Sequence, residues 1–291
     1  MTPSTGISSP KISTLVSDVD GTLVTDDKIL TVRAQAAVAK LHACGINFAI
    51  ISSRPLRGMG MLLRPLGITT PVCGFNGGVI ATPDLSVITE HLLSPEVGRR
   101  AAGLLDTHGV QVWVFAGQDW LVRDSDGPYV GFEERTVGFP PTLVDNFGQS
   151  LDVAAKIVGV SKKFENLAQR ERDVRAAFAD QATVARSQSY YLDITHPLAN
   201  KGVALSEIAK LLAVPLAEIA VIGDGGNDVA MFERSGLSIA MGNASSEVRQ
   251  AADFVTDSNR DDGFANAVER FILGGDRSNA QVAIARAAGR A

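Results

Sequence analysis

The feature that most constrains the fold is a repeated pairing of an apolar run with a helical pattern, in the first and last thirds of the chain. The runs at 12–18, 46–52 and 218–224 are largely apolar, which is typical of strands buried on both faces. Helical spacing appears between or before them, at 31–45 and 201–213. Repeated strand–helix units predict an α/β fold, a doubly wound parallel sheet with helices on both faces.

The middle of the chain, at 82–190, has a different pattern. It holds both tryptophans, Trp113 and Trp120, and it mixes alternating strands with two longer helical stretches. We therefore expect an α+β domain inserted into the doubly wound domain. The predicted division is a tail at 1–10, a core domain made of 11–81 and 191–275, the inserted domain at 82–190, and a second tail at 276–291.

Two helices in the first third carry more detailed expectations. The helix at 31–45 has four apolar residues near one face, which are Val32, Ala36, Ala39 and Leu41. Such a stripe is expected to pack against the core. Residues 54–67 predict a second, shorter helix, because Pro55 suits a first helical turn.

Two carboxylates, Asp18 and Asp20, stand one residue apart where the first apolar run ends. One carboxylate can act as a covalent nucleophile while a second serves as general acid and base. A divalent cation such as Mg²⁺ would relieve their mutual repulsion, and Gly21 lets the backbone turn tightly. The structural alternative is an Asx-type turn with a solvent-facing carboxylate.

A second acidic group follows the run at 218–224. Asp224 ends this run, two glycines turn the chain, and Asn227 and Asp228 begin a helical pattern. Three oxygen-bearing side chains within five residues suit a hard cation. The alternative is a glycine turn followed by an Asn or Asp N-cap. The glycines match neither the Walker A loop nor GxGxxG.

Ser52 and Lys201 are candidates for binding an anion. Ser52 ends an apolar run just before a helical pattern, where a hydroxyl and free backbone N–H groups could bind a phosphoryl oxygen; the alternative is an ordinary N-cap. Lys201 opens a helix, where a positive charge opposes the helix dipole. A carboxylate or phosphate partner would explain this position, and a solvated surface lysine is the alternative.

Composition limits the partners and the cellular compartment. The 27 Lys and Arg residues against 32 Asp and Glu give a net charge of −5 without a basic run, so nucleic acid is not expected as a partner. The start is polar, and no apolar run reaches the length of a membrane helix, so we expect neither a signal peptide nor a membrane partner. Cys44 and Cys73 form no disulfide or CxxC pattern, which favours a cytoplasmic protein. The sequence does not indicate an oligomeric state.

Taken in order, these features resemble the haloacid dehalogenase (HAD) superfamily of phosphohydrolases. The four segments that carry the resemblance are DVDGTLV, ISSR, NKG and GDGGND, and they lie between residues 18 and 228. The segments GFNGG at 74–78 and AMGNA at 240–244 resemble its Cof-like branch, which has a type IIB cap inserted between the second and third motifs. The chain departs from the branch at Ser52-Ser53, where Thr-Gly is common. The resemblance covers about 11–273 and implies a Rossmann-like core with an α+β cap.

The resemblance also implies roles for individual residues. Asp18 would be the nucleophile that forms an aspartyl-phosphate, and Asp20 the general acid and base. The Asp18 carboxylate, the Asp20 carbonyl and the Asp224 carboxylate would hold Mg²⁺. The remaining implied roles are support of the metal by Asn227 and Asp228, phosphate binding by Ser52 and Lys201, and possible substrate contact by Arg54 and Asn76.

Three functions fit this set of residues. The first is a Mg²⁺-dependent phosphatase of small phosphorylated metabolites, such as sugar phosphates, in which the cap selects the leaving group. The second is a phosphomutase that uses the same aspartyl-phosphate and returns the phosphoryl group to a sugar. The third is a non-catalytic sensor of a phosphorylated ligand, which would have no use for the acid and base Asp20.

Overall fold

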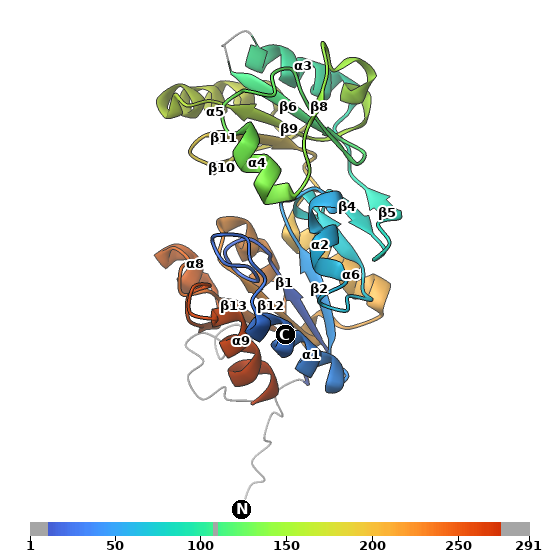
Figure 1. Cartoon of the computed structure of the whole chain (residues 1–291), viewed down its shortest axis with the longest axis vertical. Coiled ribbons are helices and arrows are strands. Elements are labelled where there is room, and N and C mark those ends of the chain that lie inside the picture. Colours follow the sequence, from blue (N-terminus) through green and yellow to red (C-terminus); the bar gives the residue numbers. More distant parts are fainter. Residues whose placement is uncertain (1–10, 107–109, 275–291) are drawn as a thin grey trace, which may run out of the picture. The chain divides into compact units, whose positions relative to one another are not determined.

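The computed structural model describes residues 11–106 and 110–274 and divides into two compact units (Figure 1). The first unit is formed by the described residues up to Ile50 and from Leu205 onward, and the second runs from Ile51 to Ala204. The expected tails at 1–10 and 276–291 lie outside the described residues. The domain boundaries expected near residues 81 and 190 stay predictions.

The first unit contains five parallel strands in the order β14-β13-β12-β1-β2. Their bounds are β1 Thr14–Ser17, β2 Asn47–Ile51, β12 Ile219–Gly223, β13 Leu237–Ala240 and β14 Phe254–Val255. Every residue of the two central strands, β1 and β12, is buried. The parallel order and the burial confirm the expected α/β core, and they agree with the largely apolar runs in the sequence.

Helices lie between these strands in the sequence or follow the last of them. They are α1 Val32–Ala43, η4 Leu216–Glu218, η5 Gly226–Asp228, α7 Val229–Phe232, α8 Ser246–Ala251 and α9 Gly263–Ala267, which continues as a π-helix, η6 Val268–Leu273. Helices α1 and α9 pack together although they are far apart in the sequence (Figure 1). Phe48 of β2 meets Phe264 of α9 edge to face, with ring centroids 5.8 Å apart.

The expected buried face of α1 is wrong except for one residue. Val32 is 81% exposed, and Ala36 and Ala39 are also exposed. The buried residues are Ala34, Ala37, Val38 and Leu41. They form a stripe with helical spacing, offset from the expected one. An alanine-rich helix offers two such stripes, and the apolar pattern alone does not distinguish them.

The second unit begins with short elements. They are η1 Leu56–Met59, α2 Gly60–Leu63, β3 Val72–Gly74, η2 Phe75–Gly77, β4 Val79–Ala81 and β5 Val87–Glu90. Strands β3, β4 and β5 pair antiparallel. The helix predicted at 54–67 is present only as a 3₁₀ turn followed by one α-helical turn. Gly58 and Gly60 lie in this stretch, and glycine is a poor helix former.

The rest of the second unit is a six-stranded sheet in the order β10-β11-β9-β6-β7-β8, antiparallel except at the β7–β8 edge. The strands are β6 Gln111–Ala116, β7 Asp119–Val122, β8 Thr142–Leu143, β9 Ala154–Val160, β10 Thr183–Gln188 and β11 Tyr191–Thr195. The helical segments are α3 Pro95–Asp106, α4 Val130–Val137, η3 Gly148–Val153 and α5 Phe164–Phe178; helix α6, Lys201–Leu212, begins after this sheet, and its residues from Leu205 onward belong to the first unit. This mixture is the α+β architecture expected of the insertion.

The two faces of this sheet are distinguished by alternation along β6. Val112 and Val114 belong to a hydrophobic core built with residues of α3 and α5. Trp113 and Phe115, at the positions between, point to the opposite face. There both rings lie against Trp120 of β7, with centroid distances of 5.0 Å from Trp113 and 6.0 Å from Phe115. The tryptophans therefore form part of the packed interior of the unit.

Candidate active site

Asp18 is positioned by the central pair of parallel strands. It directly follows β1 and is 6% exposed. Its backbone N–H donates to the carbonyl of Ile222 in β12 at 2.9 Å, which extends the parallel pairing past the end of β1. Because both strands end at the same edge of the sheet, Asp18 comes close to Asp224, which follows β12.

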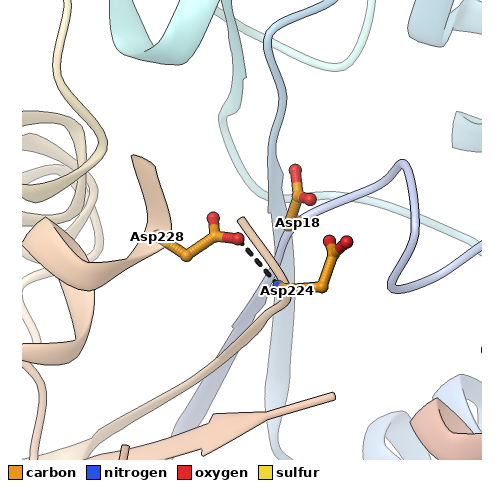
Figure 2. Close-up of side chains that lie close together, drawn as sticks. All are labelled: Asp18, Asp224 and Asp228. Atoms are coloured by element: carbon orange, nitrogen blue, oxygen red, sulfur yellow. Dashed lines mark hydrogen bonds between the residues drawn. The ribbon is translucent and has the colours of Figure 1, made fainter. Parts of the chain in front are cut away.

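Asp18, Asp224 and Asp228 form a group of three carboxylates (Figure 2). Each offers one oxygen, and these oxygens all lie within 4.8 Å of one another. Carboxylates this close repel each other, and a hard divalent cation is the partner that oxygen ligands of this kind favour. The three residues therefore fit the Mg²⁺ ion that the sequence implied.

Asp228 lies deepest in this group, with no exposed surface. Its Oδ2 accepts hydrogen bonds from the backbone N–H groups of Asp224 and Gly225, at 2.9 and 2.8 Å; Figure 2 draws the first of these. Asp228 therefore fixes the backbone of the loop that carries Asp224. Asn227 is exposed, and its Oδ1 lies against Gly225.

The carboxylate of Asp224 is held at both oxygens. The hydroxyl of Thr22 donates to Oδ1 at 2.9 Å, and the side-chain amide of Asn243 donates to Oδ2 at 3.3 Å. Gly21 approaches the same carboxylate so closely that a Cβ at this position would lie 2.3 Å from Oδ2. The acidic loop after β1 is thus packed directly on Asp224.

The side chain of Asp20 forms an ion pair with a lysine, unlike the three clustered carboxylates. It is not part of the three-carboxylate group, and its Oδ1 forms an ion pair with the ammonium of Lys28 at 2.8 Å. Both side chains are about one quarter exposed, at 26% and 27%. Sequence reasoning did not identify Lys28, because its contact depends on a turn in which Lys28 itself has a φ of 64°.

Ser52, Arg54 and Asn76 come together in the second unit. The hydroxyl of Ser52 accepts from the backbone N–H of Arg54 at 3.1 Å, and its carbonyl accepts from the backbone N–H of Asn76 at 2.8 Å. Ser52 and Arg54 are buried, with 1% and 4% exposure. The guanidinium of Arg54 donates to the carbonyl of Gly58 at 3.3 Å. Asn76 lies in a left-handed turn, with a φ of 59°.

Lys201 begins α6 and is a buried lysine, only 1% exposed. The residue before it, Asn200, caps the helix, because its Oδ1 accepts from the backbone N–H groups of Gly202 and Val203, at 2.8 and 3.3 Å. The turn that carries Asn76 packs on this first helical turn: a Cβ at Gly77 would lie 2.3 Å from the Cβ of Ala204. The surface-lysine alternative is therefore excluded for Lys201.

A family model described as haloacid dehalogenase-like hydrolase matches residues 15–268, which span both units and every residue of the candidate site. The chain belongs to this family. The expectation drawn from the four motifs is confirmed, and the chain is an enzyme of this hydrolase family. The acidic residues described above are therefore those of a haloacid dehalogenase-like hydrolase.

Individual relatives are similar to this chain over most of its length. A putative phosphatase of Haemophilus influenzae is 28% identical over 87% of this chain and 95% of its own length. The crystal structure of a haloacid dehalogenase-like hydrolase from Bacteroides thetaiotaomicron superposes with a TM-score of 0.83, at 27% identity, covering 90% of this chain and 100% of that one. A HAD subclass IIB sugar phosphatase shares the fold, with a TM-score of 0.76 at 22% identity, over 89% of this chain and 98% of that one. The expected phosphatase class and the Cof-like, type IIB architecture are thus confirmed.

Sequence reasoning on this haloacid dehalogenase-like hydrolase missed several supporting residues, among them Thr22, whose hydroxyl donates to Asp224. Lys28, Asn200 and Asn243 all make contacts with or beside predicted site residues. Asn200 and Asn243 lie inside segments that carried the family resemblance, and that was the signal available for them. Within 11–106 and 110–274, no helix combines the length and apolarity needed to span a membrane.

Proposed function

We propose that this chain is a Mg²⁺-dependent phosphatase that hydrolyses small phosphate monoesters, sugar phosphates among them, through an aspartyl-phosphate. The observation that carries the proposal is the group of Asp18, Asp224 and Asp228, whose oxygens lie within 4.8 Å of one another at the ends of adjacent parallel strands. The sugar class is suggested by the resemblance to the Cof-like branch and by the sugar phosphatase that shares the fold.

In the proposed first half-reaction, a carboxylate oxygen of Asp18 attacks the phosphorus of the substrate. The bond between phosphorus and the ester oxygen breaks, and Asp20 donates a proton to the leaving alkoxide. Asp20 must carry this proton before the step, so its ion pair with Lys28 has to open. The products are an aspartyl-phosphate at Asp18 and a free alcohol.

In the second half-reaction, the Asp20 carboxylate takes a proton from water while the water oxygen attacks phosphorus. The bond to Asp18 breaks, inorganic phosphate leaves, and both aspartates return to their starting states. Bound Mg²⁺ would supply charge neutralisation for the phosphoryl oxygens. The residues proposed to hold it are the carboxylates of Asp18 and Asp224 and the backbone carbonyl of Asp20.

The other predicted residues have supporting roles in this proposal. Asn227 and Asp228 support the metal-binding loop, and the hydrogen bonds from Asp224 and Gly225 to Asp228 are consistent with that role. Ser52 and Lys201 bind phosphoryl oxygens in this proposal; both side chains are only 1% exposed, and Lys201 supplies a positive charge at the start of α6. Arg54 and Asn76 are proposed to contact the substrate.

We place the protein in the cytoplasm, with a small phosphorylated metabolite as its partner. Both cysteines are free: Cys44 is exposed and Cys73 is buried. Burial raises the pKa of the Cys73 thiol, which keeps it protonated and unreactive. Two free cysteines suit a reducing compartment.

The proposal is tested by incubating the purified chain with a panel of hexose, pentose and alditol phosphates, with and without Mg²⁺. We expect free phosphate to accumulate with Mg²⁺ and the rate to vanish with EDTA. Full activity in metal-free buffer would contradict the metal site. Conversion of a sugar phosphate to its isomer without phosphate release would identify a phosphomutase instead, and binding without any product would identify a sensor.

A further inference from the structure

Asn243, to which the sequence analysis gave no role, contacts two parts of the candidate site. It lies three residues after β13, on the same sheet edge as the ends of β1 and β12. Its Nδ2 donates to the carbonyl of Gly21 at 2.9 Å and to Oδ2 of Asp224 at 3.3 Å. One side chain therefore bridges the loop of the nucleophile and a carboxylate of the metal site.

The orientation of the Asn243 amide is fixed by its partners. The carbonyl of Gly21 can only accept, so it must face the NH₂ group. On the other side, the backbone N–H of Asn259 donates to Oδ1 of Asn243 at 3.0 Å, so an oxygen must stand there. Exchanging the two amide atoms would break all three contacts.

Asn259 is itself anchored to the acidic loop. It is 5% exposed, and its Nδ2 donates to the carbonyl of Val24 at 3.2 Å and to Asp26 at 3.0 Å. Asn243 and Asn259 thus fasten the loop after β1 to the segments that follow β13 and β14. The hydrogen bond from Asn259 to Oδ1 of Asn243 therefore fixes the amide whose Nδ2 donates to Asp224.

We infer that Asn243 is a positioning residue that sets the orientation of the Asp224 carboxylate and thereby the affinity of the site for Mg²⁺. This inference rests on the proposed function, which assigns the metal to Asp18 and Asp224. Thr22 holds one oxygen of Asp224 and Asn243 the other, so the carboxylate cannot rotate freely. Loss of a group that orients a metal ligand typically weakens metal binding by about 10–100-fold.

The test is Mg²⁺ binding by the purified full chain without substrate, measured by calorimetry, with Mn²⁺ binding by electron paramagnetic resonance as a second readout. The variants are Asn243→Ala and Asn243→Leu, of which the leucine keeps the branched shape at Cγ but has no donor. We expect the dissociation constant for Mg²⁺ to rise about tenfold in both. In kinetics, the Mg²⁺ concentration at half-maximal rate rises, and saturating Mg²⁺ restores much of kcat.

Asn266→Ala is the matched control. Asn266 is a partly exposed asparagine that also makes several side-chain hydrogen bonds, to Asp257, to the carbonyl of Asp261 and to Arg33, none of them with Asp224. Its loss is expected to change the melting temperature but not Mg²⁺ affinity. The melting temperature of each Asn243 variant, with and without Mg²⁺, separates a loss of folding from a loss of metal binding.

The variant Asp224→Asn distinguishes a failure of the proposed metal site from a failure of the role assigned to Asn243. If this variant binds Mg²⁺ as tightly as the wild type, the proposed metal site itself is wrong. If Asp224→Asn weakens binding while both Asn243 variants keep wild-type affinity, the metal site stands and the role of Asn243 is overturned. A lower melting temperature with unchanged Mg²⁺ affinity would likewise reduce Asn243 to a structural residue.

Discussion

At the scale of single residues, the site depends on close approach of the backbone to a carboxylate. Gly21 has a φ of 77°, a conformation that side chains rarely adopt, and an added Cβ would lie 2.3 Å from Asp224 Oδ2. Both observations exclude any larger residue at this position. The glycine that the sequence assigned to a tight turn therefore also makes room for the Asp224 carboxylate.

Gly21→Ala is expected to impair the site and the fold together. The methyl group forces Asp224 aside, so Mg²⁺ affinity falls at least tenfold, and the strained backbone lowers the free energy of unfolding by about 1–3 kcal/mol. Calorimetry with Mg²⁺ and urea unfolding measure the two effects. Gly45→Ala is the control, since Gly45 has a φ of 70° but nothing within 4 Å of an added Cβ. Equal Mg²⁺ affinity in both variants would contradict the steric argument.

The sequence predicted the acidic residues of the site better than their supports. Asp18, Asp224 and Asp228 could be predicted because each follows a buried strand or opens the next helix, and parallel strands end at one edge. Lys28 could not, because its contact with Asp20 depends on a positive φ at Lys28, and the contact of Asn243 with the carbonyl of Gly21 joins residues 222 positions apart. Local spacing carries no information about such pairs.

At the scale of elements, two histidines connect the segments that enter and leave the six-stranded region. His91 is the first residue after β5 and His196 the first after β11, and their rings stack with centroids 5.5 Å apart and planes 19° apart. The backbone N–H of Leu198 donates to Nδ1 of His196 at 3.0 Å. Partial burial, and then the neighbouring His91, lower the pKa of His196.

This lowered pKa predicts a loss of stability in acid. Below the unfolded-state pKa of about 6.5, the unfolded chain takes up a proton at His196 that the folded chain resists. Stability from this source is therefore complete above about pH 6.5 and falls as the pH drops below it. Urea unfolding at about pH 7.5 and 5.5 should show a smaller acid-induced loss in His196→Asn, in which an amide oxygen can replace Nδ1. An equal loss in wild type and variant would contradict the prediction.

A second element-scale prediction concerns the ion pair between β9 and β11. Lys156 Nζ lies 3.5 Å from Asp193 Oδ2, and both side chains are only 10% exposed. The other oxygen of Asp193 has no hydrogen-bond partner within the described part of the chain. Each charge is therefore compensated mainly by its partner across the strand pair.

Lys156→Met should leave the Asp193 carboxylate buried and uncompensated, which costs about 3–5 kcal/mol of unfolding free energy. The double variant Lys156→Met, Asp193→Leu should recover much of that loss, because no buried charge remains. Urea unfolding of the wild type, both single variants and the double variant measures the coupling. Additive losses in the double variant would show that the pair is not coupled.

The sequence predicted that helix α1 exists but not which of its faces is buried. The existence of α1 and its approximate bounds followed from helical spacing and the Gly45 stop. Its buried face did not, because alanines occur on both sides and small residues do not mark one. The segment at 54–67 likewise has apolar residues at helical spacing, but it forms a 3₁₀ turn and a single α-helical turn.

At the scale of the whole molecule, the order of motifs along the chain predicted the family, and a family model over 15–268 confirms it. Three of the four motifs directly follow strands of the parallel sheet, β1, β2 and β12, whose carboxyl ends lie at one edge, while the third motif opens α6 with Lys201. Selection of the leaving group could not be predicted in the same way. The resemblance assigns this selection to the inserted cap, and strand alternation does not identify which of its side chains would contact a substrate.

The central claim is that Asp18 becomes phosphorylated, and it is tested most directly by trapping that state in Asp20→Asn. An activated aryl phosphate needs no proton on its leaving group, so phosphoryl transfer to Asp18 still proceeds, while water attack lacks its base. After acid quenching, mass spectrometry should find one phosphoryl group on the peptide that carries Asp18, dependent on Mg²⁺ and absent from the Asp18→Asn variant. Phosphate release without a phosphorylated chain, or a phosphoryl group on another residue, would contradict the account.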